Sequence, residues 1–278
     1  MVSLLGRFLR RPYVLFRLWL ESLLPPRKST NPLSPHRSGL QAVFFDARER
    51  GDWAVAEDTC RQLIALNDFP MALYRDWWHL AGILEQQGRS DEAYQAILAS
   101  TRAARDSKLN RLIIMALQHE TDGAAHQGER KRAYACIEEG LRRSARDDFP
   151  LPWDQARFLV RRARLRLEDG EAELAMLDLQ KAEPRLFKSQ IDGVLPICKI
   201  WWEIIALLRL AQGNTLGAKA AGQEALRLGR RIAEFPQLAE FDRRQGLRRT
   251  LERFAELHEN LGESEVAEAA RQEASAIK

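Results

Sequence analysis

The feature that most constrains this chain is a glycine that recurs six times, each time followed five residues later by an alanine. Glycine adopts the left-handed turn that ends a helix at little cost, and alanine lets a second helix approach the first closely. A position seven residues before each glycine is also small, except for Phe44 in the first unit. The pattern predicts six antiparallel helix hairpins, turning at Gly51/Ala56, Gly88/Ala93, Gly128/Ala133, Gly170/Ala175, Gly213/Ala218 and Gly262/Ala267.

The composition fits a chain built entirely from helices. Ala, Leu, Arg and Glu dominate, all of them strong helix formers, and no run alternates with period 2 for long enough to build a sheet. Three Phe-Pro pairs, at 69–70, 149–150 and 235–236, fall where second helices should have finished. Proline cannot continue a helix, and the neighbouring Phe is expected to pack under the turn. The predicted fold class is all-α.

The repeated positions resemble those of the tetratricopeptide repeat (TPR) family over about residues 38–278. The resemblance implies an α-solenoid of about six antiparallel hairpins over 40–278, with a groove lined by the first helices. Glycine-to-glycine spacings of 37, 40, 42, 43 and 49 residues make the array irregular, so a generic α-solenoid or an irregular bundle stays open. The best-matching unit carries Trp77, Leu80, Ala81, Leu84, Gly88, Ala93, Ile97 and Ser100.

The groove positions that the family resemblance implies give the candidate partner-binding residues: Arg75, Trp78, Gln118, Arg157 and Arg164. Trp78 could anchor a peptide, and packing between repeats is the alternative. Arg157 and Arg164, with other arginines on the same predicted helix, favour an acidic peptide or tail as partner. A solvated face paired with neighbouring carboxylates is the alternative interpretation of that arginine run. The same run also motivates the second function considered, a nucleic-acid-binding helical repeat.

Residues 1–24 form a basic amphipathic stretch, followed by a Pro/Ser/Arg-rich linker at 25–39. The first 39 residues hold a balance of +6 against a total of +4, so the rest of the chain is close to neutral and general nucleic-acid binding is disfavoured. Basic and apolar residues separate onto two faces of the predicted arm, which is typical of an interfacial helix. The membrane-contacting residues predicted are Leu5, Phe8, Arg10, Arg11, Phe16, Arg17 and Trp19.

Several alternatives compete for this arm. Arg17 and Glu21 interrupt every window long enough to span a bilayer, and no small-residue cleavage site follows for a secretory signal. A transit peptide and a cap that packs on the first hairpin both stay open. The expected location is cytoplasmic and peripheral at the membrane, or organellar after transit-peptide cleavage.

Motifs for catalysis or cofactor binding were sought and not found. The sequence has no phosphate-binding glycine loop, nucleophile elbow or kinase motif set. His119 and His126 could share a helix face, but no third ligand is spaced to complete a metal site. The three cysteines lie far apart, as expected of buried free thiols. The sequence therefore predicts a non-enzymatic protein-interaction scaffold with no cofactor and no metal.

Overall fold

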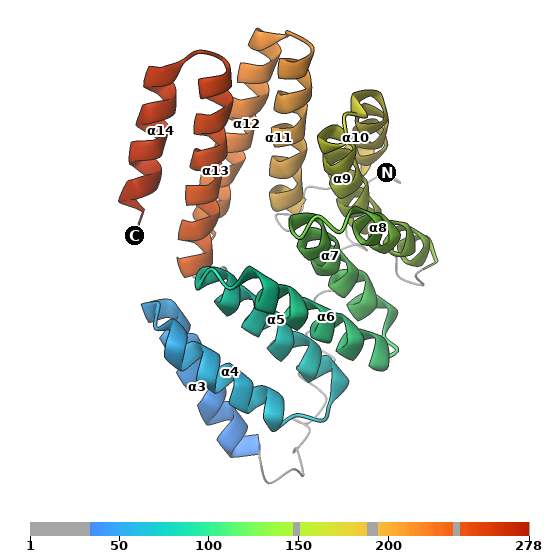
Figure 1. Ribbon diagram of the computed structural model, residues 1–278, viewed down its shortest axis with the longest axis vertical. Helices are drawn as coiled ribbons and strands as arrows, with labels where there is room; N and C mark the ends of the chain where they lie inside the picture. Colours follow the sequence, from blue (N-terminus) through green and yellow to red (C-terminus); the bar gives the residue numbers. More distant parts are fainter. Residues whose placement is uncertain (1–33, 147–150, 188–193, 236–239, 278) are drawn as a thin grey trace, which may run out of the picture.

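Successive antiparallel helix pairs build the molecule (Figure 1). The computed structural model describes residues 34–146, 151–187, 194–235 and 240–277; within these ranges it has twelve helices and no strand. The all-α prediction is confirmed. The helices are α3 (Ser34–Arg50), α4 (Trp53–Ala65), α5 (Pro70–Gln86), α6 (Ser90–Asp106), α7 (Asn110–His126), α8 (Arg130–Ala145), α9 (Pro152–Glu168), α10 (Ala172–Phe187), α11 (Leu195–Ala211), α12 (Thr215–Ala233), α13 (Glu240–Asn260) and α14 (Ser264–Ala276).

Each hairpin turns at one of the six predicted glycines, whose φ angles lie between 73° and 82°. The amide that follows the glycine donates to a carbonyl five residues earlier, as from Arg89 to Leu84 at 2.9 Å, and this bond closes the first helix. The carbonyl of Arg89 then accepts the amide of Ala93 at 3.0 Å, the first bond of the second helix. One residue therefore ends one helix and begins the next, which explains the fixed five-residue offset.

The small residues of the pattern lie where the two helices of a hairpin meet. The six alanines that follow the glycines are at most 2% exposed, and so are the six positions that precede them by twelve residues. In the first unit that earlier position is Phe44, whose ring packs against Phe45 and His79 at centroid distances of 5.0 and 5.1 Å. The close approach predicted from the sequence is confirmed.

Two details of the sequence interpretation were wrong. Phe69 is 55% exposed at the N-cap of α5 rather than packed under the turn, because Pro70 begins the helix and directs the preceding side chain outward. The linker predicted to reach residue 39 ends earlier, since α3 begins at Ser34, where Pro35 is tolerated in a first helical turn. The arm at 1–24 and its membrane-contacting residues lie outside the described residues.

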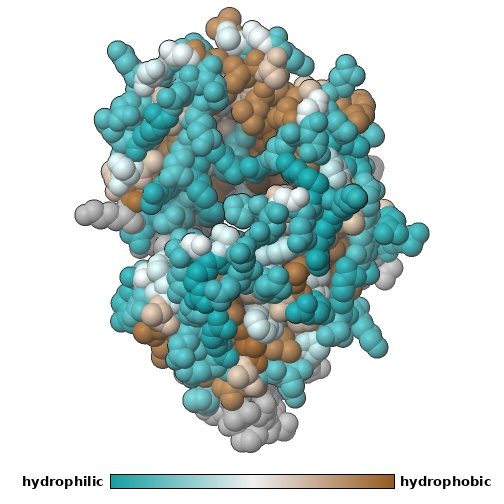
Figure 2. Space-filling model, viewed as in Figure 1, coloured by the Kyte–Doolittle hydropathy of each residue, from teal (hydrophilic) through white to brown (hydrophobic). Residues whose placement is uncertain are grey.

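The array curves with its first helices on the inner side. Neighbouring first helices pack on one another, α7 on α9 and α9 on α11, and no pair of second helices among those described packs as closely. The curve is tight enough for α13 to contact α3, so the sixth hairpin returns to the first (Figure 1). A hollow opens near the centre of this face, with apolar side chains along one side of it and hydrophilic side chains along the others (Figure 2). The fold is a tetratricopeptide-like α-solenoid bent almost into a ring.

Candidate protein-binding surface

A line of stacked rings crosses the first three hairpins on their first helices. We call Phe45, Trp78, His79 and His119 the aromatic ladder. The rings of Phe45 and His79 meet edge to face at 5.9 Å, those of His79 and Trp78 lie 5.0 Å apart, and Trp78 reaches His119 of α7 at 5.3 Å. Phe45 and Trp78 stay 48% and 39% exposed. Large rings that are held in place yet half exposed are typical of binding surfaces.

His119 forms the end of the ladder on α7. Burial lowers the pKa of its imidazole to about 4, and the nearby Arg161 and Arg157 guanidiniums act in the same direction, while Asp122 opposes them. The ring is therefore neutral at physiological pH. A neutral ring stacks on Trp78 without bringing a charge that would need solvation, which keeps the ladder an apolar surface.

Arg75 lies one helical turn before Trp78 on α5, and thus on the same face. Its side chain is 47% exposed, and its Nε lies 3.5 Å from the carboxylate of Asp76. Asp76 is buried, and Arg37 and Asn67 already donate to it at 2.9 and 2.8 Å. Because Asp76 has these closer donors, most of the hydrogen-bonding capacity of Arg75 still faces solvent.

Arg157 and Gln118 lie side by side between α9 and α7. The guanidinium of Arg157 donates to Oε1 of Gln118 at 3.4 Å, a long bond. Burial, together with the neighbouring Arg161 and Arg111 guanidiniums, lowers the pKa of Arg157 to about 10. Gln118 is only 4% exposed, and its Nε2 has no hydrogen-bond partner among the described residues. Gln118 therefore orients Arg157 and is not itself an accessible contact.

The other arginines of α9 are engaged in ion pairs. Arg161 donates twice to Asp122, and Arg162 donates twice to Asp178 at 2.8 Å and also to Glu138. Arg166 reaches the same Asp178, which is completely buried. Arg164 pairs with Glu168 at 3.2 Å and is 49% exposed. The carboxylates lie on four different helices, so these pairs mainly fix α9 against its neighbours.

The structure thus brings four of the five predicted partner-binding residues into two adjacent places. Trp78 is an exposed member of the ladder, with Arg75 one helical turn before it. Arg157 lies near the His119 end of the ladder and next to the buried Gln118. Arg164 lies further along α9, near its C-terminal end. The sequence interpretation missed the histidines of the ladder, although His79 and His119 share one place in their units, nine residues before the glycine. This shared position in the repeat could have predicted from the sequence that the two histidines lie on the same face of the array.

Reactive or metal-binding groups do not gather elsewhere in the described part of the chain. Burial raises the pKa of the Cys60 and Cys136 thiols to about 12 and that of Cys198 to about 11, so all three are poor nucleophiles. No three His, Cys, Asp or Glu side chains of the described residues approach closely enough to hold one metal ion. None of the described helices carries an apolar stretch long enough to span a bilayer.

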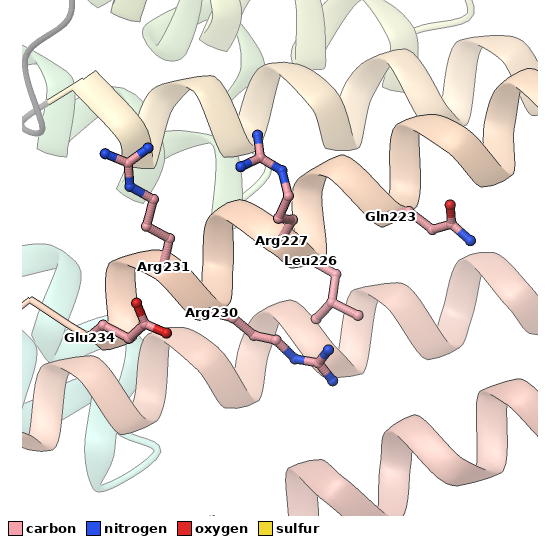
Figure 3. A pocket seen from close by; sticks show the side chains of 6 residues that line it. All are labelled: Gln223, Leu226, Arg227, Arg230, Arg231 and Glu234. Atoms are coloured by element: carbon pink, nitrogen blue, oxygen red, sulfur yellow. The ribbon is translucent and has the colours of Figure 1, made fainter.

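A surface depression of about 460 Å³ lies along α12 (Figure 3). Arginines dominate its lining, but Arg227 pairs with Glu224 and Arg230 with Glu273, each at 2.8 Å. Its charges are therefore largely balanced, and it offers no selective anion site. The residues lining it are Gln223, Leu226, Arg227, Arg230, Arg231 and Glu234.

Comparison with known proteins gives the fold and no family. No protein-family model and no curated protein matches the sequence. The crystal structure of BtubC (BKLC) from P. vanneervenii is similar, with a TM-score of 0.51 and 15% identity over 83% of this chain and 89% of that one. A tetratricopeptide repeat protein from Parabacteroides merdae has a TM-score of 0.45 and 19% identity over 87% and 80% of the two chains. The chain therefore has a tetratricopeptide-like helical-repeat fold.

Proposed function

We propose that this protein is a non-enzymatic interaction scaffold whose inner face binds an extended acidic segment of a partner protein. The observation that carries the proposal is the exposure of Phe45 and Trp78 in a stacked ladder with arginines beside it. The proposal extends to the arm at 1–24, which would hold the array at an anionic membrane surface.

The ladder and the arginines supply complementary parts of such a site. A half-exposed Trp ring can cover an aromatic or aliphatic side chain of the partner, and such buried rings are frequent energetic centres of interfaces. Arg75 and Arg157 present planar donors suited to carboxylates. Since the rings lie on three successive first helices, the bound segment would run across α3, α5 and α7 rather than along one helix.

The arginines of α9 do not favour the nucleic-acid alternative. Their guanidiniums already donate to carboxylates of neighbouring helices, so they add little net positive potential to the surface.

The binding test uses the full chain as bait for a displayed library of random peptides. We expect enrichment of sequences that place Asp or Glu next to an aromatic or aliphatic residue. Trp78→Ala should weaken binding of the enriched peptides at least about tenfold, and Arg157→Glu should abolish the preference for acids. Leu216→Ala, at a residue 79% exposed on α12, is the matched control and should change nothing. Enrichment of peptides without acids, or binding indifferent to Trp78→Ala, contradicts the proposal.

The membrane part of the proposal has its own test. The full chain should float with vesicles rich in phosphatidylserine and not with vesicles of phosphatidylcholine alone, because arginines bind anionic headgroups. Charge reversal at Arg10, Arg11 and Arg17 should abolish flotation. The same reversal at Arg227 and Arg230 on α12, which changes the net charge in the same direction, is the control and should leave it intact. Equal flotation of both variants would rule out the anchor.

A further inference from the structure

The first helix of each hairpin has a face that packs on the hairpin before it. The residue twelve positions before the turn glycine lies on this face, and in the second to sixth hairpins it is at most 7% exposed. Ala116 of α7 packs there with Ala103 and Ala104 of α6. The indole N–H of Trp201 on α11 donates to the carbonyl of Leu179 on α10 at 3.2 Å. The five residues at this position are Asp76, Ala116, Phe158, Trp201 and Thr250.

The other three residues at this position also contact the preceding second helix. The thiol of Cys60 on α4 donates to the carbonyl of Asp76 on α5 at 3.2 Å. Phe158 lies against a glycine of α8, and Thr250 lies against a glycine of α12, without space for a Cβ on either glycine. At all five junctions of the described hairpins, the second helix of one hairpin therefore covers this face of the next first helix.

In the first hairpin, which forms one end of the array (Figure 1), the same face is uncovered. Gly39 holds the equivalent position and is exposed, and a Cβ there would meet no atom within 4 Å. Val43, one helical turn later, is 46% exposed, whereas Leu80 and Ile205 at the equivalent place are 1% and 4% exposed. The side chain of Asp46, a further turn along, is 63% exposed. Among the described residues, α3 thus has no helix on the face that is covered in every later unit.

The stretch at 13–24 has the length and the position in the chain of such a covering helix. It lies between Pro12 and Pro25, and its twelve residues compare with the thirteen of α4. The nine residues at 25–33 would connect it to α3, against connections of three residues at 107–109 to seven at 188–194 between described hairpins. Its large apolar side chains recur with the spacing of one helix face. They are Leu15, Phe16, Trp19, Leu20 and Leu23.

The charges of the two segments are complementary. Residues 1–33 contain six Arg or Lys and one Glu, whereas the first hairpin at 40–65 contains five Asp or Glu and three Arg. Opposite net charges at close range attract each other. A second copy of the chain that offered its own first hairpin would instead bring two acidic surfaces together. The charges therefore favour the chain's own N-terminal segment as the occupant of this face.

We propose that residues 13–24 bind the uncovered face of α3, in the place that a second helix takes in every later unit. Gly39 and Val43 are small, so they leave space for the large rings of Phe16 and Trp19. In this docked form the apolar side chains of the segment are turned to α3 and are not available to a bilayer. Docking on α3 and the membrane contact proposed above therefore exclude each other.

The test measures the reactivity of one introduced thiol in the full chain, first without vesicles. Val43→Cys places the thiol on the face, and Val266→Cys, at a residue of α14 that is 41% exposed, is the matched control. The three native thiols are buried and should stay unlabelled. Maleimide should label Val43→Cys at least about tenfold more slowly than Val266→Cys, because the thiol at 43 reacts only while the segment is detached.

Substitutions in the segment identify the occupant. Phe16→Glu combined with Leu20→Glu should raise the labelling of Val43→Cys to the control rate, because carboxylates are not tolerated in an apolar contact. Arg17→Glu makes the same change in net charge on the opposite side of the predicted helix, and it should keep most of the protection. Circular dichroism checks that each variant keeps its helices.

Three results would overturn the docking. They are equal labelling of Val43→Cys and Val266→Cys, protection that survives Phe16→Glu with Leu20→Glu, and protection that grows with protein concentration, which would assign the face to a second copy. Labelling is then repeated on chains that float with vesicles rich in phosphatidylserine, where Val43→Cys should react at the control rate. Continued protection on those vesicles would refute the exclusion, whereas failure to float would refute only the membrane contact.

Discussion

Gly140 on α8 tests whether the array depends on the close approach of neighbouring units. A Cβ built at this position would lie 2.1 Å from Cζ of Phe158 and 2.4 and 2.5 Å from its two Cε atoms. Phe158 is completely buried on α9, so its ring has no free space into which it could move. Replacing glycine by alanine inside a helix stabilises it by about 1 kcal/mol, whereas overpacking a dense core costs about 1–3 kcal/mol. Because three ring atoms clash at once, the upper part of that range applies, and Gly140→Ala should lower the free energy of unfolding by about 1–2 kcal/mol.

Gly82 of α5 provides the matched control. It is also inside a helix, but a Cβ there would meet no atom within 4 Å. Gly82→Ala should therefore raise the free energy of unfolding by about 0.5–1 kcal/mol. Urea unfolding followed by far-UV circular dichroism gives the global value, and hydrogen exchange localises the loss to α8 and α9, since repeat arrays need not unfold in one step. In the Gly140→Ala background, Phe158→Leu should cost less than it does alone, because the two changes share one space. Equal stabilisation by both alanines would refute the packing argument.

Three further predictions concern single positions. Asp178→Ala leaves Arg162 and Arg166 without their buried carboxylate and should destabilise the fold by about 3 kcal/mol, whereas Glu252→Ala, which breaks an exposed pair with Arg248, should cost under about 0.5 kcal/mol; urea unfolding of both distinguishes a structural pair from a solvated one. Gly128→Ala, at a φ of 73°, should cost about 1–2 kcal/mol, measured in the same way. The folded-state pKa of His119 is lowered to about 4 from 6.5, so its contribution is complete above pH 6.5 and is lost as the pH falls toward 4; between pH 7.5 and 5 the wild type should lose about 1–2 kcal/mol more than His119→Phe, and an equal loss would contradict the assignment.

The hairpins were predictable because their determinants are local. The turn at Gly88, the helix start at Pro70 and the buried Ala93 each depend on residues within a few positions of one another. Inner-face position alone, however, did not reveal that Gln118 is buried beneath Arg157. The arginines of α9 looked like one charged surface in the sequence, since their carboxylate partners lie on other helices, such as Asp122 on α7.

The aromatic ladder depends on the relative placement of three units. Trp78 meets His119 only because α5 and α7 pack side by side, and their register follows from unit spacings that are irregular in this chain. Equivalent positions can be found from the glycines, as His79 and His119 show, but whether their side chains meet depends on the curvature. The curvature, and with it the return of α13 to α3, is a property of the whole array and has no local signature.

The residue after each glycine closes one helix with its amide and begins the next with its carbonyl. This arrangement restricts where the chain can gain or lose residues. One residue inserted between Gly213 and Ala218 would rotate α12 by about 100° about its axis and turn its buried alanines outward. Insertions at all six turns are excluded in the same way. Growth and loss of residues must therefore occur at the opposite edge, where one hairpin connects to the next. We expect natural variants, and engineered tags, to be accepted between α12 and α13 and rejected at the glycine edge.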